Sequence, residues 1–330
     1  MTVGLMAGYK QILIVFFSIW MLGCTPTIHK PGNAIMEPRL LDDRYITPDG
    51  AQLPLRYWYP EQDEPEAVLI ALHGFNDYSQ FFEEPGKFLK DHRIVSYAYD
   101  QRGFGASASR GLWSGIDAYA EDLNQFIDLV KSQHQGLPVY LLGESMGGAV
   151  AIAAMARNQT TMVDGLILAA PAVWARETMP WYQRALLWLL ARTMPWLTLT
   201  GQGLGVVASD NIDMLIELGK DPLVIKATRV EAIHGLTNLM DEAFSNARNI
   251  PVDTLMLYGE KDEIIPPKPM YRFLREFSDH NAAAKTIALY ENGYHMLLRD
   301  LQAKVIWQDI YTWIKSSNTA ALPSGADRRW

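Results

Sequence analysis

Six short apolar runs, each unbroken rather than alternating with polar residues, leave few folds open to this chain. Continuous apolar runs of four to eight residues are typical of parallel strands that helices cover on both faces. Segments with the apolar spacing of helices lie between several of them. This alternation predicts an α/β fold with a mostly parallel, doubly wound sheet. The runs are Ala67–Leu72, Val95–Tyr99, Val139–Leu142, Leu166–Ala170, Thr254–Tyr258 and Thr286–Tyr290.

Two further extended runs come before the first of these. Arg44–Thr47 and Leu53–Tyr59 flank the turn sequence Pro48-Asp49-Gly50, which predicts an antiparallel hairpin. Farther along, apolar residues recur at helical spacing between Tyr119 and Val130, before a stop at Gln135-Gly136.

The composition narrows the class of protein. With 49% hydrophobic and 20% charged residues and a single Cys among 330 residues, the chain has the usage of a soluble globular protein. This argues against a disordered tail, a collagen, a disulfide scaffold or a polytopic membrane protein. The net charge of −8 would repel a polyanion, so we expect no nucleic-acid partner.

The first apolar run, from Ile12 to Leu22, indicates where the protein is sent. It is too short to span a bilayer and fits the core of a signal peptide. The run ends in Met21-Leu22-Gly23-Cys24, which resembles the lipobox of bacterial lipoproteins, where cleavage precedes an acylated Cys. We therefore predict a lipoprotein signal peptide over residues 1–23 and lipidation of Cys24. A plain signal peptide or a short interfacial anchor is the alternative, and translation could start at Met1 or Met6.

Acyl chains on Cys24 would hold a globular domain at a membrane without a spanning helix. Cys24 is the only cysteine, so it has no partner for an intrachain disulfide. Residues 24–40 contain Pro26 and Pro31 and lack periodicity, which predicts a tether. Thr25 after the Cys resembles the form sorted to the outer membrane, so we expect a lipid-anchored protein of the bacterial envelope that faces the periplasm. The oligomeric state stays open.

The segment from Ala172 to Arg248 breaks the alternation of strands and helices. Pro180 can begin a helix that ends near Met194, and we expect no strand in the segment. We predict a core of residues 41–171 and 249–315, a helical cap of residues 172–248 and a flexible tail of residues 316–330. Each Trp of the insert is expected to pack the cap against the body, and the insert as a whole to supply an apolar pocket. These residues are Trp174, Trp181, Trp188 and Trp196.

A G-x-S-x-G pattern follows the predicted strand Val139–Leu142. In Gly143-Glu144-Ser145-Met146-Gly147, the glycines allow a sharp turn from strand to helix, and the serine stands exposed on that turn. This context predicts that Ser145 is a nucleophile.

A serine hydroxyl needs a base, and the base needs an acid to orient it. His295 follows the strand Thr286–Tyr290 and Asp262 follows Thr254–Tyr258, so both are expected on loops at one sheet edge. The chain order Ser145, Asp262, His295 is that of the α/β hydrolases. Glu260 and Glu263 remain possible acids, while His234 and His280 are weaker candidates for the base.

Acyl transfer also needs donors for the oxyanion. We assign them to the backbone N–H groups of Phe75 and Met146, and expect His73, before Phe75, to be structural.

Together these segments resemble the monoacylglycerol lipase and lysophospholipase branch of the α/β hydrolases. The resemblance implies an α/β-hydrolase fold with a helical cap and no metal or organic cofactor. It also implies that a serine enzyme cleaves single-chain acyl esters through an acyl-enzyme. The branch contains thioesterases, other esterases and peptidases as well. The matching segments are His73-Gly74, Asp100–Ser107, the turn at Ser145, Asp221-Pro222-Leu223, the Asp262 loop and His295.

Two other functions stay open at this point. A peptidase or amidase could use the same triad, with acidic residues of the insert holding a substrate amine; a non-catalytic envelope lipoprotein is the more distant alternative. The acidic residues that could do so are Glu177, Asp210, Asp213 and Glu217.

Overall fold

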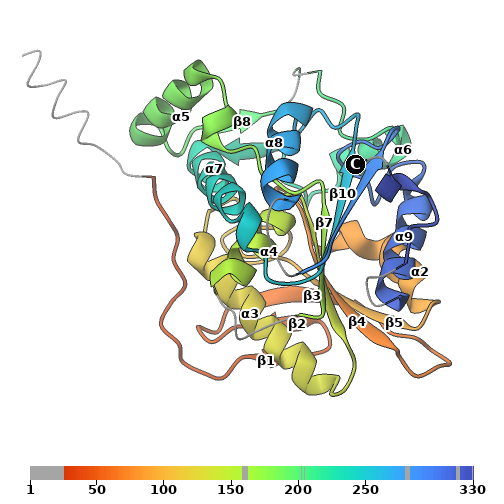
Figure 1. Cartoon of the computed structure of the whole chain (residues 1–330). Coiled ribbons are helices and arrows are strands. Elements are labelled where there is room, and N and C mark those ends of the chain that lie inside the picture. The colour runs from red at the N-terminus through yellow and green to blue at the C-terminus, as the bar shows by residue number, and fades with distance from the viewer. Residues whose placement is uncertain are drawn as a thin grey trace, which may run out of the picture.

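The computed structural model describes residues 26–157, 163–201, 203, 205–278, 283–316, 320–328 and 330. Within these residues, a nine-stranded sheet in the order β1-β2-β3-β5-β4-β6-β7-β10-β11 forms the centre of the molecule (Figure 1). The strands from β5 to β11 run parallel, and β1, β2 and β3 pair antiparallel at one edge. The predicted mostly parallel α/β sheet is thus confirmed. The strand bounds are β1 Arg39–Leu40, β2 Arg44–Ile46, β3 Gln52–Trp58, β4 Ala67–Leu72, β5 Ile94–Tyr99, β6 Val139–Glu144, β7 Gly165–Ala169, β10 Thr254–Gly259 and β11 Lys285–Tyr290.

All six predicted apolar runs are strands of this sheet. Ala67–Leu72 coincides with β4, and the ends of the other five differ from the prediction by one or two residues. The predicted hairpin is also confirmed, because β2 and β3 pair antiparallel. Its turn is closed by a bond from Gly50 N–H to the carbonyl of Thr47 (2.9 Å), with Gly50 at φ 81°.

Helices cover both faces of the sheet, and a separate cluster of buried apolar side chains lies on each face. α3, α4, α7 and α8 lie on one side in Figure 1, and α2 and α9 on the other. The helix predicted from the spacing after Tyr119 is confirmed as α3. The helix bounds are α2 Glu83–Lys90, α3 Ile116–Gln133, α4 Met146–Arg157, α7 Val230–Ser245, α8 Pro267–Ser278 and α9 Ala303–Lys315, with short 3-10 turns at Ser79–Phe82, Arg176–Thr178, Ala247–Asn249 and Ala326–Arg328.

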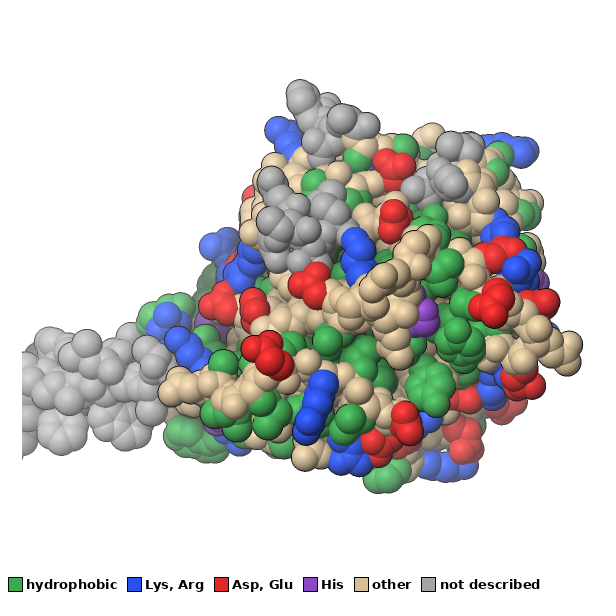
Figure 2. All heavy atoms as spheres, turned by 90° about the horizontal axis from the view of Figure 1, so that it is seen from below, with side chains coloured by type: hydrophobic (Ala, Val, Ile, Leu, Met, Phe, Trp, Pro, Cys, Tyr) green, Lys and Arg blue, Asp and Glu red, His purple; other side chains and the backbone are tan. Residues whose placement is uncertain are grey.

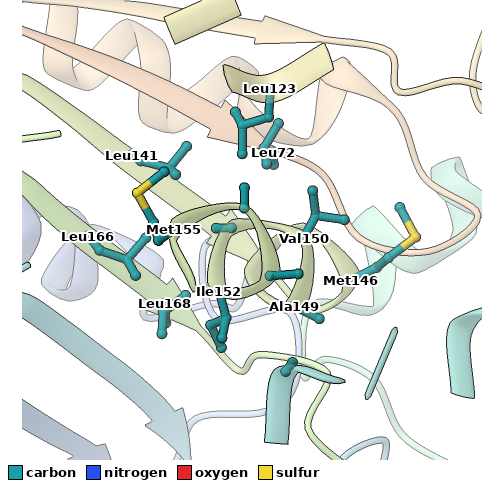
Figure 3. Close-up of a cluster of buried hydrophobic side chains, with 14 of the residues drawn as sticks. Leu72, Leu123, Leu141, Met146, Ala149, Val150, Ile152, Met155, Leu166 and Leu168 are labelled. Atoms are coloured by element: carbon teal, nitrogen blue, oxygen red, sulfur yellow. The ribbon is translucent and has the colours of Figure 1, made fainter. Parts of the chain in front are cut away.

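Helix α4 sits in the middle of the first cluster. Its side chains, Val150 and Ile152 among them, are buried from Met146 to Met155. Figure 3 shows them surrounded by leucines of the neighbouring strands and of α3, such as Leu72 and Leu141. Close packing on every side fixes the direction of α4, and with it the position of the turn from β6 that precedes it.

The insert between β7 and α7 contains α5 (Trp181–Thr193), β8 (Thr198–Thr200), α6 (Ile212–Lys220) and β9 (Ala227–Arg229). The expectation that it holds no strand is wrong, because β8 and β9 pair antiparallel. Strands of three residues are too short to show a periodic pattern, and they depend on each other for pairing.

Helix α7 lies within the predicted cap but packs as a core helix. Its residues Leu239 and Ala243 are fully buried in the same cluster as α4. The part of the insert outside the core layer therefore precedes Val230.

Three of the four Trp residues of the insert differ from the expectation. Trp181, Trp188 and Trp196 are 77%, 45% and 57% exposed, so they do not pack the cap against the body. Trp174 alone packs, partly buried, against the core.

The segment before β1 has no regular structure, yet it is tied to the body. The N–H of His29 donates to the carbonyl of Trp113 (2.8 Å), and that of Ile35 to the carbonyl of Pro48 (2.8 Å). This differs from a free tether, since backbone bonds to distant loops hold the segment from His29 onward. Cys24 and the predicted signal peptide lie outside the described residues. Among the helices that the structure describes, none is long and apolar enough to cross a membrane.

The C-terminal segment also differs from the predicted flexible tail. In the described residues 320–328, Leu322 and Ala326 are buried against the second cluster. The N–H of Ser324 donates to Asp309 of α9 (3.0 Å). Isolated apolar side chains in a mostly polar segment gave no periodic signal for this packing.

Candidate active site

Ser145 stands at the sharp turn between β6 and α4. Its backbone φ is 51°, in the left-handed region that residues other than glycine rarely adopt. The N–H of Ser145 donates to Ala169 of β7 (3.0 Å), and its carbonyl accepts from Ala149 (3.1 Å) and Ala172 (2.9 Å). These bonds hold the strained residue on the turn, as the G-x-S-x-G context predicts.

The glycines on either side make this turn possible. A Cβ on Gly147 would lie 2.3 Å from the carbonyl oxygen of Leu72, and one on Gly143 would lie 2.5 Å from the backbone of Gly147. Both distances are far below contact, so only glycine lets α4 approach β4 and β6 this closely.

His295 and Asp262 meet although they come from different loops. Asp262 follows β10 and His295 follows β11, and Nδ1 of His295 lies 2.8 Å from Oδ2 of Asp262. The other carboxylate oxygen accepts from the N–H groups of Ile264 (2.8 Å) and Ile265 (2.9 Å). Asp262 is thereby fixed with one oxygen turned to the imidazole.

Burial of His295 by itself would lower the pKa of the imidazole. The charge and the hydrogen bond of Asp262 outweigh burial, and Glu144 adds to them, so the pKa of His295 is raised above its ordinary value. The surroundings therefore favour the protonated imidazole, the form that exists after a base has accepted a proton.

The other acids and histidines that the sequence left open lie elsewhere. Glu263 accepts from the N–H of Val207 (2.8 Å) and Glu260 from the hydroxyl of Tyr271 (3.3 Å). His234 lies on α7, where burial, with Arg176 and Arg192 nearby, lowers its pKa to about 4. His280 is outside the described residues.

Ser145 and His295 line one cavity of about 190 Å³. Gly74 and Phe75 line the same cavity, and a Cβ on Gly74 would lie 3.9 Å from Oγ of Ser145. Met146 is the first residue of α4, where an N–H has no partner within the helix. Both backbone segments assigned to the oxyanion thus lie beside the serine.

His73 supports this loop from behind. It is buried, its Nδ1 donates to the carbonyl of Gly74 (2.8 Å), and its Nε2 accepts from the N–H of Gln101 (3.0 Å). Burial lowers the pKa of His73, which suits the neutral ring that these two bonds require. The contacts agree with the structural role expected for His73.

Sequence reasoning missed Arg299, which joins two loops of the site and the end of β6. Nη2 of Arg299 donates to Asp77 (2.7 Å), on the loop after β4, and to Glu144 (3.0 Å), next to Ser145. Arg299 itself lies four residues after His295. Its position after the histidine was visible in the sequence, but nothing there showed that Asp77 and Glu144 lie together.

A larger cavity of about 870 Å³ adjoins the first, since Asp77, Leu218 and Arg299 line both. Leu218 of α6 and Val224 after it belong to the insert and line the smaller cavity. The predicted contribution of the insert to a pocket is therefore made by α6 and the loop after it, and the exposed Trp residues are not part of it. No group of three or more His, Cys, Asp or Glu side chains in the described ranges could hold a metal ion.

A family model described as Hydrolase_4, serine aminopeptidase S33, matches residues 63–302. The chain belongs to this family. It is 27% identical to human monoglyceride lipase over 282 residues, which cover 84% of this chain and 91% of that one. It is 23% identical to a monoacylglycerol lipase of Mycolicibacterium smegmatis over 272 residues, which cover 81% of this chain and 94% of that one.

Solved structures share the fold. A soluble variant of Saccharomyces cerevisiae monoglyceride lipase in complex with a substrate analogue superposes with a TM-score of 0.70 at 20% identity, covering 90% of this chain and all of that one. The monoacylglycerol lipase of Paleococcus ferrophilus superposes with a TM-score of 0.65 at 24% identity, covering 80% of this chain and 99% of that one. The α/β-hydrolase fold is thus confirmed.

Proposed function

We propose that this chain is a serine hydrolase that cleaves carboxylic esters of single-chain lipids, of the monoacylglycerol or lysophospholipid type. The observation that carries the proposal is the convergence of three loops. Ser145 and His295 line one cavity, and His295 is hydrogen-bonded to the buried Asp262. A hydroxyl, an imidazole and a carboxylate in this arrangement are the parts of a nucleophilic triad.

In the proposed first half-reaction, Oγ of Ser145 attacks the acyl carbonyl while Nε2 of His295 accepts the hydroxyl proton. Asp262 holds the proton on Nδ1 and stabilises the imidazolium that forms. The N–H groups of Phe75 and Met146 donate to the oxyanion. His295 then protonates the leaving alcohol, and the acyl group remains on Ser145.

In the second half-reaction, water enters where the alcohol has left. His295 accepts a proton from this water, which attacks the acyl-enzyme, and the fatty acid departs as Ser145 regains its proton.

The substrate class rests on the relatives and on the shape of the site. Human and mycobacterial relatives are named as monoglyceride and monoacylglycerol lipases. The cavity at Ser145 is bordered by Leu218, Val224 and Met296, apolar side chains suited to an acyl chain. The adjoining larger cavity leaves room for the rest of a lipid.

A peptidase or amidase on the same triad is the second candidate, because the family description names a serine aminopeptidase. Of the four acidic residues considered for binding an amine, only Glu217 lines the larger cavity, and it pairs with Lys220 (2.9 Å). Glu177 pairs instead with Arg272 (3.2 Å). We favour an ester because the human and mycobacterial relatives are named as lipases. A panel of acylglycerols, lysophospholipids, acyl thioesters and aminoacyl amides separates these activities.

We further propose that acyl chains on Cys24 anchor the protein to the bacterial outer membrane, facing the periplasm. Anchoring would concentrate the enzyme near lipid substrates. Incorporation of labelled palmitate into the full chain in a bacterial host, and its loss in Cys24→Ser, tests the modification; fractionation of inner and outer membranes tests the location.

The decisive test of the catalytic proposal is Ser145→Ala. The variant should lose ester hydrolysis and labelling by a fluorophosphonate, while its circular dichroism and melting temperature stay near those of the unmodified chain. If the unmodified folded protein takes up no probe and cleaves no substrate of the panel, a non-catalytic lipoprotein becomes the better description.

A further inference from the structure

The segment of the insert that leads into α6 has one buried side chain. Charged and hydrophobic side chains are mixed on the opposite face of the molecule, which Figure 2 shows from below, and most of this segment is exposed as well. Among the residues that the structure describes from Trp196 to Val224, only Ser209 is buried. A buried hydroxyl needs a hydrogen-bond partner, so the contacts of Ser209 show what holds this part of the insert in place.

Ser209 is bonded to a carboxylate that follows the candidate catalytic histidine. Its hydroxyl donates to Oδ1 of Asp300 (2.6 Å), which is itself buried. Oδ2 of Asp300 accepts from the N–H of Tyr294 (2.8 Å), the residue before His295. One carboxylate therefore links the insert to the backbone that carries His295.

The ionised form of Asp300 fits both bonds, because each of its oxygens faces a donor. Burial raises the pKa of Asp300 to about 6, and the bonds from Ser209 and Tyr294 act against that shift. At neutral pH the carboxylate therefore prevails and accepts both hydrogen bonds. An amide at this position would keep one acceptor and turn its own donor toward a second donor.

The same segment bonds to the loops of the site at two further points. The carbonyl of Ala208 accepts from the N–H of Met296 (3.0 Å), the residue after His295. The N–H of Val207 donates to Glu263 (2.8 Å) on the acid loop. Both neighbours of His295 are thus held by bonds that lead to the insert.

Asn211 fastens the start of α6 to the same loop. Its side-chain N–H donates to the carbonyl of Arg299 (2.9 Å), and its Oδ1 accepts from the N–H of Met214 in the first turn of α6 (3.2 Å). Leu218 of this helix lines the cavity at Ser145. The helix that borders the cavity therefore begins at a bond to the histidine loop.

We propose that Ser209 and Asp300 are positioning residues for His295, so that the insert belongs to the framework that aligns the triad. Asp300 fixes the loop that carries the imidazole, and Ser209 fixes Asp300 to the insert. Neither side chain needs to touch the reacting atoms, because a displacement of about 1 Å can cost on the order of 10²-fold in rate. This inference rests on the proposed function, since it concerns the same triad.

The test compares three substitutions of buried hydroxyl groups. Ser209→Ala removes the bond to Asp300, and Ser209→Thr keeps a hydroxyl. The control is Thr254→Val, which removes a buried hydroxyl that donates to the carbonyl of Val252 (2.8 Å). Thr254 begins β10, at the end of the strand away from Asp262. Circular dichroism and melting temperature establish that each variant is folded and compare the losses of stability.

We expect kcat for a short, soluble ester to fall about tenfold in Ser209→Ala while KM changes by less than about twofold, because the base is displaced and the pocket remains. Ser209→Thr should restore most of the loss, and Thr254→Val should leave kcat unchanged. Asp300→Asn should lose more than Ser209→Ala, since it also disturbs the bond to Tyr294. Combining Ser209→Ala with Asp300→Asn should add little, because the two side chains share one bond.

A folded Ser209→Ala variant with unchanged kcat would overturn the inference. An equal loss of kcat in Thr254→Val would overturn it as well, because the effect would then follow from lower stability alone.

Hydrogen–deuterium exchange tests the same link without a substrate. In Ser209→Ala, amide exchange should become faster in residues 291–301 of the histidine loop as well as in residues 205–218 of the insert. Faster exchange confined to the insert would count against the inference. If the unmodified chain cleaves no ester and takes up no fluorophosphonate, the proposed function fails, and exchange still decides whether Ser209 holds the loop of His295.

Discussion

At the scale of single residues, the surroundings of His295 bear on its proposed role as a base. The imidazole is buried, which disfavours its charged form, yet Asp262 at 2.8 Å more than compensates, so its pKa is raised. A base whose protonated form is stabilised in this way can accept the proton of Ser145. The same stabilisation makes the protonated ring persist to higher pH in the free enzyme.

The pH dependence of the proposed ester hydrolysis follows from this shift. Because the neutral imidazole is the active form, kcat/KM should rise with pH, with a midpoint above about 6.5, the value of unperturbed histidine. Asp262→Asn should move the midpoint down and lower kcat by roughly 10⁴-fold, since the tautomer is no longer fixed. A midpoint at or below 6.5 in the unmodified enzyme would contradict the assigned effect of Asp262.

A second prediction concerns Arg299. Arg299→Ala removes the only cation bonded to Asp77 and Glu144 in the described structure, and both carboxylates are buried. We expect the free energy of unfolding to fall by about 3–5 kcal/mol, measured in urea near pH 7. Arg299→Lys keeps the charge, so its free energy of unfolding should fall by less. If both variants lose equally little stability, Arg299 does not hold Asp77 and Glu144 together with its own loop.

At the scale of elements, the turn from β6 into α4 depends on the absence of side chains. Gly143 and Gly147 let the helix start directly behind the strand, and Ser145 takes the strained conformation between them. Burial of α4 on all sides keeps this geometry against the strain.

Two glycine substitutions should therefore have opposite effects. Gly147→Ala should lower the melting temperature by several degrees and reduce ester hydrolysis, because its Cβ would overlap the carbonyl of Leu72. Gly219→Ala, in α6 with nothing within 4 Å of the added Cβ, should stabilise the helix by up to about 1 kcal/mol. Thermal unfolding of both variants tests this prediction. Equal effects on stability would mean that α4 can move away from Leu72 and make room for the added Cβ at position 147.

At the scale of the whole molecule, the parallel sheet gathers the site. The carboxyl ends of β4, β6, β10 and β11 lie at one edge, so loops separated by more than two hundred residues meet there. The C-terminal segment is fastened to the same body, since its described residues 320–328 pack on α9 and β11.

The C-terminal packing gives a prediction at this scale. Leu322 is 1% exposed, so Leu322→Ala should lower the free energy of unfolding by about 2–5 kcal/mol in urea denaturation. The matched control is Leu301→Ala, because Leu301 is 73% exposed. This substitution should change the free energy of unfolding by less than about 0.5 kcal/mol. A loss below 1 kcal/mol for Leu322→Ala would indicate a loosely held tail.

The sequence alone determined the sheet and the triad candidates, because both depend on local signals. Continuous apolar runs mark buried strands whatever their neighbours are, and the turn at Ser145 requires its glycines in the strand-to-helix link itself. His295 and Asp262 could be proposed because strand-exit loops of a parallel sheet share one edge.

Only the tertiary structure decided the rest. The hydrogen bond of His295 to Asp262 and not to Glu260 or Glu263, the bonds of Arg299, the pairing of β8 with β9 and the packing of Leu322 each depend on contacts between distant segments. Such contacts leave no periodic trace in the sequence. The exposed Trp residues of α5 show the same limit, because an apolar face looks alike in sequence whether it packs against protein or faces outward.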